Sequence, residues 1–139
     1  GAINDMMPYR MMNKIAYALN RHKKAMSGST ILFIGIAYKP DIDDARESPA
    51  LLVMEQVEKK GATVVYHDPY IPEFEDEHGR KHTGTTLSID ILEKADCVVF
   101  TTNHSCLDID FIVNNAKLIV DTRNAVKTVH IETEKVFKL

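Results

Sequence analysis

The sequence predicts an α/β fold, a three-layer sandwich in which helices cover both faces of a parallel sheet, preceded by a long N-terminal helix. Two observations carry this expectation. From residue 30 onward, short apolar runs rich in β-branched residues alternate with segments of helical periodicity, whereas the residues before 28 show helical spacing alone. Strands that alternate with helices at this spacing are joined by right-handed crossovers and therefore lie parallel.

The first segment, about residues 4–24, is expected to form one amphipathic helix. Its apolar stripe is rich in methionine, which fills irregular gaps, so we interpret the stripe as a packing surface in the core or between subunits. Residues 27–29 (Ser-Gly-Ser) then break the pattern. We place a domain boundary there, with a helical, dimer-forming segment over 1–27 and a second domain over 28–139. The stripe consists of Met7, Met11, Ile15 and Leu19.

The first strand and the helix after it have the clearest local signals. Residues 30–36 form a β-rich apolar run typical of a buried parallel strand. Ser48-Pro49 predicts the start of a helix, with Ser48 as N-cap and Pro49 in the first position. Gly61 predicts its C-terminal end. The expected apolar face of this helix is Ala50, Val53, Met54 and Val57.

The same alternation continues to residue 121, and it makes the second domain Rossmann-like. A long polar loop over residues 67–84 separates the second strand from the next helix. The remaining strands are expected at 62–66, 97–101 and 117–121, and the remaining helices at 88–94 and 108–114.

Composition excludes several classes of function. The net charge is −3 and the basic residues are dispersed, so nucleic acid is not an expected partner. No apolar run approaches the ~20 residues that a membrane span requires, and no signal peptide is visible. The two cysteines, with Cys97 in an apolar run and Cys106 after a turn, suit a reducing compartment. We therefore expect a cytoplasmic protein, and the start within a helical pattern suggests an excised domain.

Ligands of open α/β sheets bind at the carboxyl ends of the strands. Four polar loops follow predicted strands in this sequence and should lie at that edge. A functional site is therefore expected among residues 37–47, 67–72, 102–107 and 122–126.

The first of these loops predicts an anion site. It has neither a GxGxxG dinucleotide fingerprint nor a Walker A motif. Instead it places Tyr38, Lys39 and Arg46 just before a helix N-terminus, whose unpaired N–H groups and dipole attract phosphate. Lys39 can act as a point charge on a diphosphate and Arg46 as a bidentate anion clamp. The alternative is a solvated loop whose charges pair with each other.

Three carboxylates in this loop raise the alternative of a divalent cation. Lys39 and Arg46 flank them and could neutralise them, so we expect no metal. A phosphorelay receiver is excluded because the third strand ends in Thr101-Thr102 where an acceptor aspartate would be required. The carboxylates are Asp41, Asp43 and Asp44.

The other loops offer single candidates. Asp68 stands where a dinucleotide-binding domain places its ribose-binding acid, but a turn role in Asp68-Pro69 is favoured without the glycine fingerprint. His67 and His104 are expected to be exposed or hydrogen-bonded loop residues. Arg123 could clamp a phosphate or carboxylate, with a surface salt bridge as the alternative. No nucleophile, base and orienting group stand together, which indicates binding without catalysis.

Residues 35–49, GIAYKPDIDDARESP, resemble the signature of the UDP-glucose/GDP-mannose dehydrogenase family at the start of its C-terminal, UDP-binding domain. The likeness covers nearly the whole chain and fades in the last dozen residues. Within the family, this segment looks more like the branch that acts on UDP-N-acetylhexosamines than the UDP-glucose branch, and UDP-glucose stays as the alternative substrate. The other matching segments are residues 4–8, 18–20, 61–72 and 120–124.

The resemblance implies an enzyme that oxidises the C6 hydroxyl of a UDP-hexose or UDP-N-acetylhexosamine to a carboxylate with NAD, for polysaccharide biosynthesis. It implies UDP-sugar contacts for Tyr38, Lys39 and Arg123, and places Arg46 on the NAD side of the cleft. NAD itself would be bound mainly by an absent N-terminal domain, and the enzyme would be a homodimer or higher oligomer.

The resemblance also implies what this chain lacks. The catalytic cysteine of the family lies in a glycine- and proline-rich stretch upstream, and neither Cys97 nor Cys106 has that context. The isolated chain should therefore be inactive. The alternatives are a stand-alone nucleotide-binding module and a dimerisation module that works through its Met-rich helix.

Overall fold

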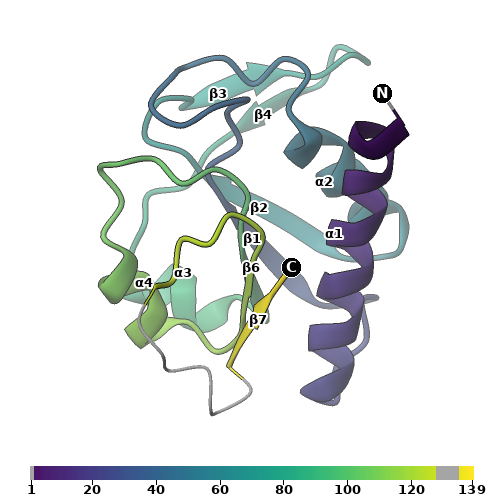
Figure 1. The fold of residues 1–139 in the computed structure, drawn as a ribbon, viewed down its shortest axis with the longest axis vertical. Helices are drawn as coiled ribbons and strands as arrows, with labels where there is room; N and C mark the ends of the chain where they lie inside the picture. The colour runs from purple at the N-terminus through teal and green to yellow at the C-terminus, as the bar shows by residue number, and fades with distance from the viewer. Residues whose placement is uncertain (1, 128–134) are drawn as a thin grey trace.

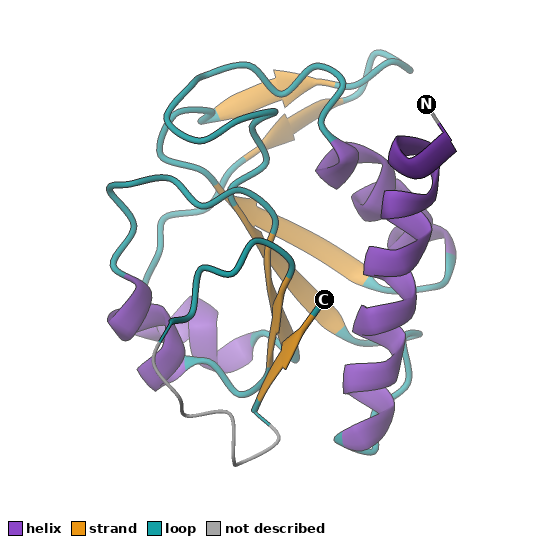
Figure 2. Cartoon of the chain, in the orientation of Figure 1, coloured by secondary structure: helices purple, strands orange, loops and turns teal. Residues whose placement is uncertain are grey.

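A computed structural model describes residues 2–127 and 135–139, with side chains described from residue 6 onward. Five parallel strands form one sheet in the order β2-β1-β5-β6-β7, with α1 and α2 on one side and α3 and α4 on the other (Figures 1 and 2). This is the Rossmann-like α/β architecture that the sequence predicts. The helices are α1 (Ala2–Arg21), α2 (Pro49–Lys59), α3 (Ile89–Lys94) and α4 (Ile109–Asn115). The sheet strands are β1 (Thr30–Ile34), β2 (Thr63–His67), β5 (Cys97–Phe100), β6 (Ile119–Asp121) and β7 (Val136–Lys138).

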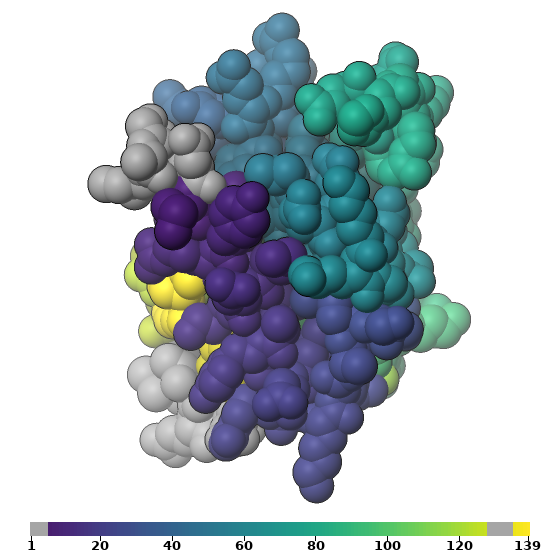
Figure 3. All heavy atoms as spheres, turned by 90° about the vertical axis from the view of Figure 1, so that its right-hand side faces the viewer, coloured from purple at the N-terminus to yellow at the C-terminus, as the bar shows by residue number. Residues whose placement is uncertain are grey.

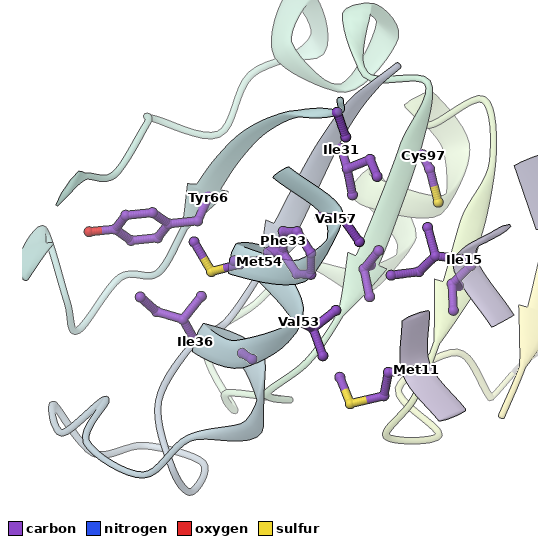
Figure 4. Packing of buried hydrophobic residues seen from close by; sticks show 14 of the residues in the cluster. Met11, Ile15, Ile31, Phe33, Ile36, Val53, Met54, Val57, Tyr66 and Cys97 are labelled. Atoms are coloured by element: carbon purple, nitrogen blue, oxygen red, sulfur yellow. The ribbon is translucent and has the colours of Figure 1, made fainter. Parts of the chain in front are cut away.

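The central strands are buried on both faces, and their alternating side chains build two separate cores. Ile31 and Phe33 of β1 point towards α1 and α2, whereas Leu32 and Ile34 point towards α3 and α4. β5 divides its side chains in the same way. Two-sided burial explains why these strands appear in the sequence as unbroken apolar runs. Figure 4 shows the first core, including Met11, Ile15, Ile31, Phe33, Val53, Val57 and Cys97.

The Met-rich stripe of α1 packs into this first core. Met11, Ile15 and Leu19 are almost completely buried, and Met7 is partly buried. Figure 3 looks onto this side of the molecule, where the purple α1 lies beside the blue-teal α2. The stripe is therefore used within the chain, which favours core packing over the alternative of a subunit interface. None of the described helices is long and apolar enough to cross a membrane.

The predicted helix caps are confirmed. The side chain of Ser48 accepts a hydrogen bond from the backbone N–H of Ala50, and Pro49 is the first residue of α2. Gly61 follows the helix with φ +98°, a left-handed conformation that glycine adopts without strain. Ser88 and Asp108 cap α3 and α4 in the same manner as Ser48. The buried residues of α2 are Ala50, Val53, Met54 and Val57.

The segment predicted as a long loop contains an antiparallel hairpin of β3 (Glu73–Glu75) and β4 (Lys81–Thr83). Aromatic contacts fix it, since Phe74 stacks on His82 with 4.7 Å between ring centroids and also contacts Tyr66. Tyr66 donates a hydrogen bond to Ile71, and burial raises the pKa of Tyr66 to about 12. A hydrogen bond from His82 holds the pKa of Asp76 in the hairpin turn well below its usual range.

The last dozen residues, where the resemblance fades, lie partly outside the described residues. Val136–Lys138 form β7, which extends the sheet beside β6 and which the sequence did not predict.

The two cysteines should differ sharply in reactivity. Cys97 is buried in β5 and burial raises the pKa of its thiol, whereas Cys106 is exposed. Because the thiolate is the reactive form, we expect a disulfide-exchange reagent to label one thiol per folded chain and both in denaturant. Peptide mapping should assign the labelled thiol to Cys106. Rapid labelling of Cys97 under native conditions would contradict the packing of the first core.

Candidate functional site

A pocket of about 320 Å³ lies at the carboxyl edge of the sheet. It is formed by the loops that follow β1, β5 and β6, three neighbours in the sheet, as expected for parallel strands. Three residues that the sequence proposed for substrate binding, Tyr38, Lys39 and Arg123, line it together. The complete lining is Tyr38, Lys39, Pro40, Thr102, Asn103 and Arg123.

The pocket has an unneutralised positive charge. Neither Lys39 nor Arg123 forms an ion pair with any residue that the structure describes. Arg123 donates from Nε to the carbonyl oxygen of Thr101 at 3.1 Å, which orients its guanidinium. The Lys39 ammonium lies 5.8 Å from the ring centroid of Tyr38, which is exposed. Two cations and an aromatic ring around one hollow suit a ligand that is both anionic and planar in part.

Arg46 lies outside this pocket. It lines a much larger hollow of about 1840 Å³ between α2 and the hairpin, which also reaches Lys39 and Arg123. Its guanidinium donates to both carboxylate oxygens of Asp44, at 3.1 and 3.0 Å, and this contact raises the pKa of Arg46 and lowers that of Asp44. The expectation that neighbouring cations neutralise the loop carboxylates is thus correct for Arg46 and wrong for Lys39.

The N-terminus of α2 does not offer the free N–H groups that the sequence suggested for phosphate. Pro49 has no N–H, Ala50 donates to the hydroxyl of Ser48 at 3.2 Å, and Leu51 donates to the carbonyl oxygen of Ser48 at 3.2 Å. Because the cap satisfies these donors, they are not available to an anion, and the positive charge of the pocket comes from Lys39 and Arg123.

The loop that carries Tyr38 and Lys39 is anchored at its start by Asp68. This buried carboxylate, at the end of β2, accepts from the backbone N–H groups of Ile36 at 2.8 Å and Ala37 at 3.2 Å. It also accepts from the N–H of Tyr70 at 2.8 Å, which confirms the predicted turn role. Since the carboxylate is buried and fully engaged, it is not free to bind a ribose.

The same loop is anchored further along by the loop after β5. The hydroxyl of Thr102 donates to the carbonyl oxygen of Ala37 at 2.6 Å. The backbone N–H of Asp41 donates to Nδ1 of His104 at 2.8 Å, and the Asp41 carboxylate accepts from the backbone N–H and hydroxyl of Ser105. The hydroxyl contact lowers the pKa of Asp41. Sequence reasoning missed this network, although it had placed both loops at one edge.

The described residues do not provide the metal site that the acidic run suggested, because Asp41 and Asp44 are engaged by Ser105 and Arg46. The described group with metal-ligating spacing consists of Glu55, Glu77 and His78, which are partly or fully exposed on α2 and the hairpin.

A dinucleotide cofactor does not fit the chain's own residues either. Gly35 is the one glycine in the loop after β1, and Asp68, the residue in the position of a ribose acid, is buried behind that loop. Of the residues that the sequence suggested for cofactor binding, Arg46 is the one that stays a candidate for a contact with NAD.

The fold and the pocket together define a Rossmann-like binding domain for an anionic ligand. Comparison with known proteins then gives the family. The chain belongs to the UDP-glucose/GDP-mannose dehydrogenase family, with residues 32–128 matching the UDP binding domain.

Curated relatives include both branches that the sequence left open. The chain is 31% identical over 130 residues to the UDP-N-acetyl-D-mannosamine dehydrogenase of Methanococcus maripaludis, covering 88% of this chain and 28% of that protein. It is 33% identical over 132 residues to the UDP-glucose 6-dehydrogenase of Rhizobium meliloti, covering 88% and 29%. The chain thus spans less than a third of the length of the relatives it matches.

Solved structures agree with this placement. An NDP-N-acetyl-D-galactosaminuronic acid dehydrogenase from Methanosarcina mazei Go1 superposes with a TM-score of 0.82 at 28% identity, covering 99% of this chain and 30% of that one. A UDP-D-ManNAc dehydrogenase from Pyrococcus horikoshii gives a TM-score of 0.79 at 27% identity, with 99% and 31% coverage.

Proposed function

We propose that this chain is the UDP-sugar-binding part of an NAD-dependent nucleotide-sugar 6-dehydrogenase, and that Tyr38, Lys39 and Arg123 bind the nucleotide end of the substrate. The observation that supports this most is the pocket in which Lys39 and Arg123 lack carboxylate partners among the described residues. A diphosphate supplies the charge that these two side chains lack, and the Tyr38 ring offers a stacking surface for a base or sugar.

The wider activity is part of the same proposal. The parent enzyme would oxidise the C6 hydroxyl of a UDP-hexose or UDP-N-acetylhexosamine to a UDP-uronic acid in the cytoplasm, for polysaccharide biosynthesis. NAD would be bound mainly outside this chain, with Arg46 reaching its side of the cleft after release from Asp44. We also propose that residues 1–27 belong to a central helical, dimer-forming segment, in keeping with a family match that begins at residue 32.

Catalysis is assigned to residues outside this chain. Two His–Asp pairs among the described residues have the form of a base with its orienting carboxylate, and the second, His82–Asp76, lies in the hairpin away from the 320 Å³ pocket. The first is the buried His104–Asp68 pair. Both ring nitrogens of His104 are already engaged inside the protein, and its side chain is not exposed. It cannot abstract a proton from a ligand in the pocket. Assaying the parent enzyme with NAD against a panel of UDP-sugars would identify the substrate branch.

Calorimetry with UDP on the 139-residue chain tests the binding site directly. We expect Lys39→Ala or Arg123→Ala to weaken UDP binding about tenfold or more, because each removes a charge-assisted contact to the diphosphate. Lys94→Ala is the matched control, since it removes one positive charge at the end of α3, where Lys94 pairs with Asp90. An unchanged affinity for UDP in Lys39→Ala would show that the first loop is assigned wrongly.

A further inference from the structure

His104 is a fully buried side chain that joins the ends of three neighbouring strands. It follows β5, its Nε2 lies 2.9 Å from the Asp68 carboxylate after β2, and its Nδ1 lies 2.8 Å from the backbone nitrogen of Asp41 in the loop after β1. Tyr70 covers its ring, with 4.7 Å between centroids. This histidine therefore contacts the loop after β1 without lining the pocket.

The hydrogen-bond pattern fixes the state of this ring. A backbone N–H can only donate, so Nδ1 of His104 must be an acceptor and carry no proton. The proton of the neutral ring is then on Nε2, where it is donated to the Asp68 carboxylate. One side chain thus presents an acceptor to one loop and a donor to another, and both positions are filled.

These hydrogen bonds fix the position of the backbone around Lys39. Asp68 holds the backbone before it, at Ile36 and Ala37, and His104 holds the backbone after it, at Asp41. The loop is therefore fixed on both sides of Lys39, although the Lys39 side chain itself is exposed. A site whose backbone is ordered before the ligand arrives loses less entropy on binding.

We propose that His104 is a positioning residue for diphosphate binding, which acts by holding the loop around Lys39 in its binding conformation through Asp41 and Asp68. The inference rests on the proposed function, because it needs the diphosphate to be held by Lys39. It gives a role in binding to a residue that does not line the pocket and that therefore could not be identified from the pocket lining alone.

Calorimetry with UDP and with uridine on the 139-residue chain separates this role from simple stabilisation. His104→Phe keeps the flat ring and removes both hydrogen bonds. We expect it to weaken UDP binding about tenfold, measured well below its melting temperature. Uridine binding should fall much less, because uridine lacks the diphosphate and contacts this loop through Tyr38 alone. His104→Gln, whose amide supplies one donor and one acceptor, should recover part of the affinity for UDP. In a Lys39→Ala background, His104→Phe should have little further effect, because the contact of Tyr38 is then the one that the loop still supports.

His82→Gln is the matched control, since His82 also pairs with an aspartate, Asp76, at 2.8 Å, but in the hairpin and away from the 320 Å³ pocket. It should leave UDP affinity unchanged. If His104→Phe lowers the melting temperature while the folded protein binds UDP as tightly as before, His104 is only structural and the inference is overturned. Equal losses for UDP and uridine, or an undiminished loss in the Lys39→Ala background, overturn it as well. If the wild-type chain binds no UDP, the proposed function itself fails.

Discussion

Gly35→Ala should be among the most damaging single substitutions in this chain, lowering the free energy of unfolding by roughly 4 kcal/mol. Gly35 directly follows β1 with φ +77°, and a Cβ there would overlap the carbonyl oxygen of Thr102. The left-handed backbone costs an L-residue about 1–2 kcal/mol, and displacing packed backbone costs about 1–3 kcal/mol more. Urea unfolding monitored by circular dichroism measures the change.

Gly28→Ala is the control that separates these two contributions. Gly28 also has a positive φ, +88°, but nothing lies within 4 Å of the position that a Cβ would take there. This variant should lose only the backbone contribution of about 1–2 kcal/mol. Equal effects at the two positions would contradict the close approach of the β1 and β5 loops.

Asp68→Asn should cost roughly 3 kcal/mol of stability, although the two side chains have almost the same shape. The Asp68 carboxylate accepts four N–H groups in a buried site, from Ile36, Ala37, Tyr70 and the His104 ring. Three of these N–H groups share Oδ2, and that of Tyr70 binds Oδ1. An asparagine with its oxygen in the Oδ2 position would accept the three without a negative charge and turn its own amide donors towards the Tyr70 N–H. Each buried donor left without an acceptor costs about 1–3 kcal/mol. Urea unfolding at neutral pH provides the measurement.

Asp76→Asn tests whether burial is the reason for that cost. Asp76 also accepts four N–H groups, from the backbone of His78 and Arg80 and from the side chains of Arg80 and His82. It is partly exposed, so water can replace lost partners. We expect a clearly smaller loss than for Asp68→Asn, and comparable losses would refute the role of burial.

The sequence predicted the elements that local chemistry determines. The two-sided burial of β1 and β5 was visible as unbroken apolar runs, and the start of α2 was visible in Ser48-Pro49. The β3–β4 hairpin was not predictable in this way. Its strands have three residues each, too few to show a period, and it depends on contacts of Phe74 with Tyr66 and His82.

The candidate site likewise has a part that the sequence could predict and a part that it could not. The gathering of Tyr38, Lys39 and Arg123 follows from the rule that parallel strands end at one edge. The expected phosphate donors at α2 were wrong because Ser48, the residue that predicts the helix, also uses those donors. The pairing of Asp68 with His104 joins residues 36 positions apart. It depends on the order of the strands, which no local pattern contains.

That strand order limits how the pocket could be transferred or redesigned. β1 lies between β2 and β5, so the loop after β1 receives its supports from both neighbours, through Asp68 on one side and Thr102 and His104 on the other. Transplanting residues 35–49 into another Rossmann-like scaffold would carry Tyr38 and Lys39 but leave Arg123 and the supports of the loop behind. A working graft needs the ends of β2, β1, β5 and β6 together, and protein engineers should treat those four loops as one unit.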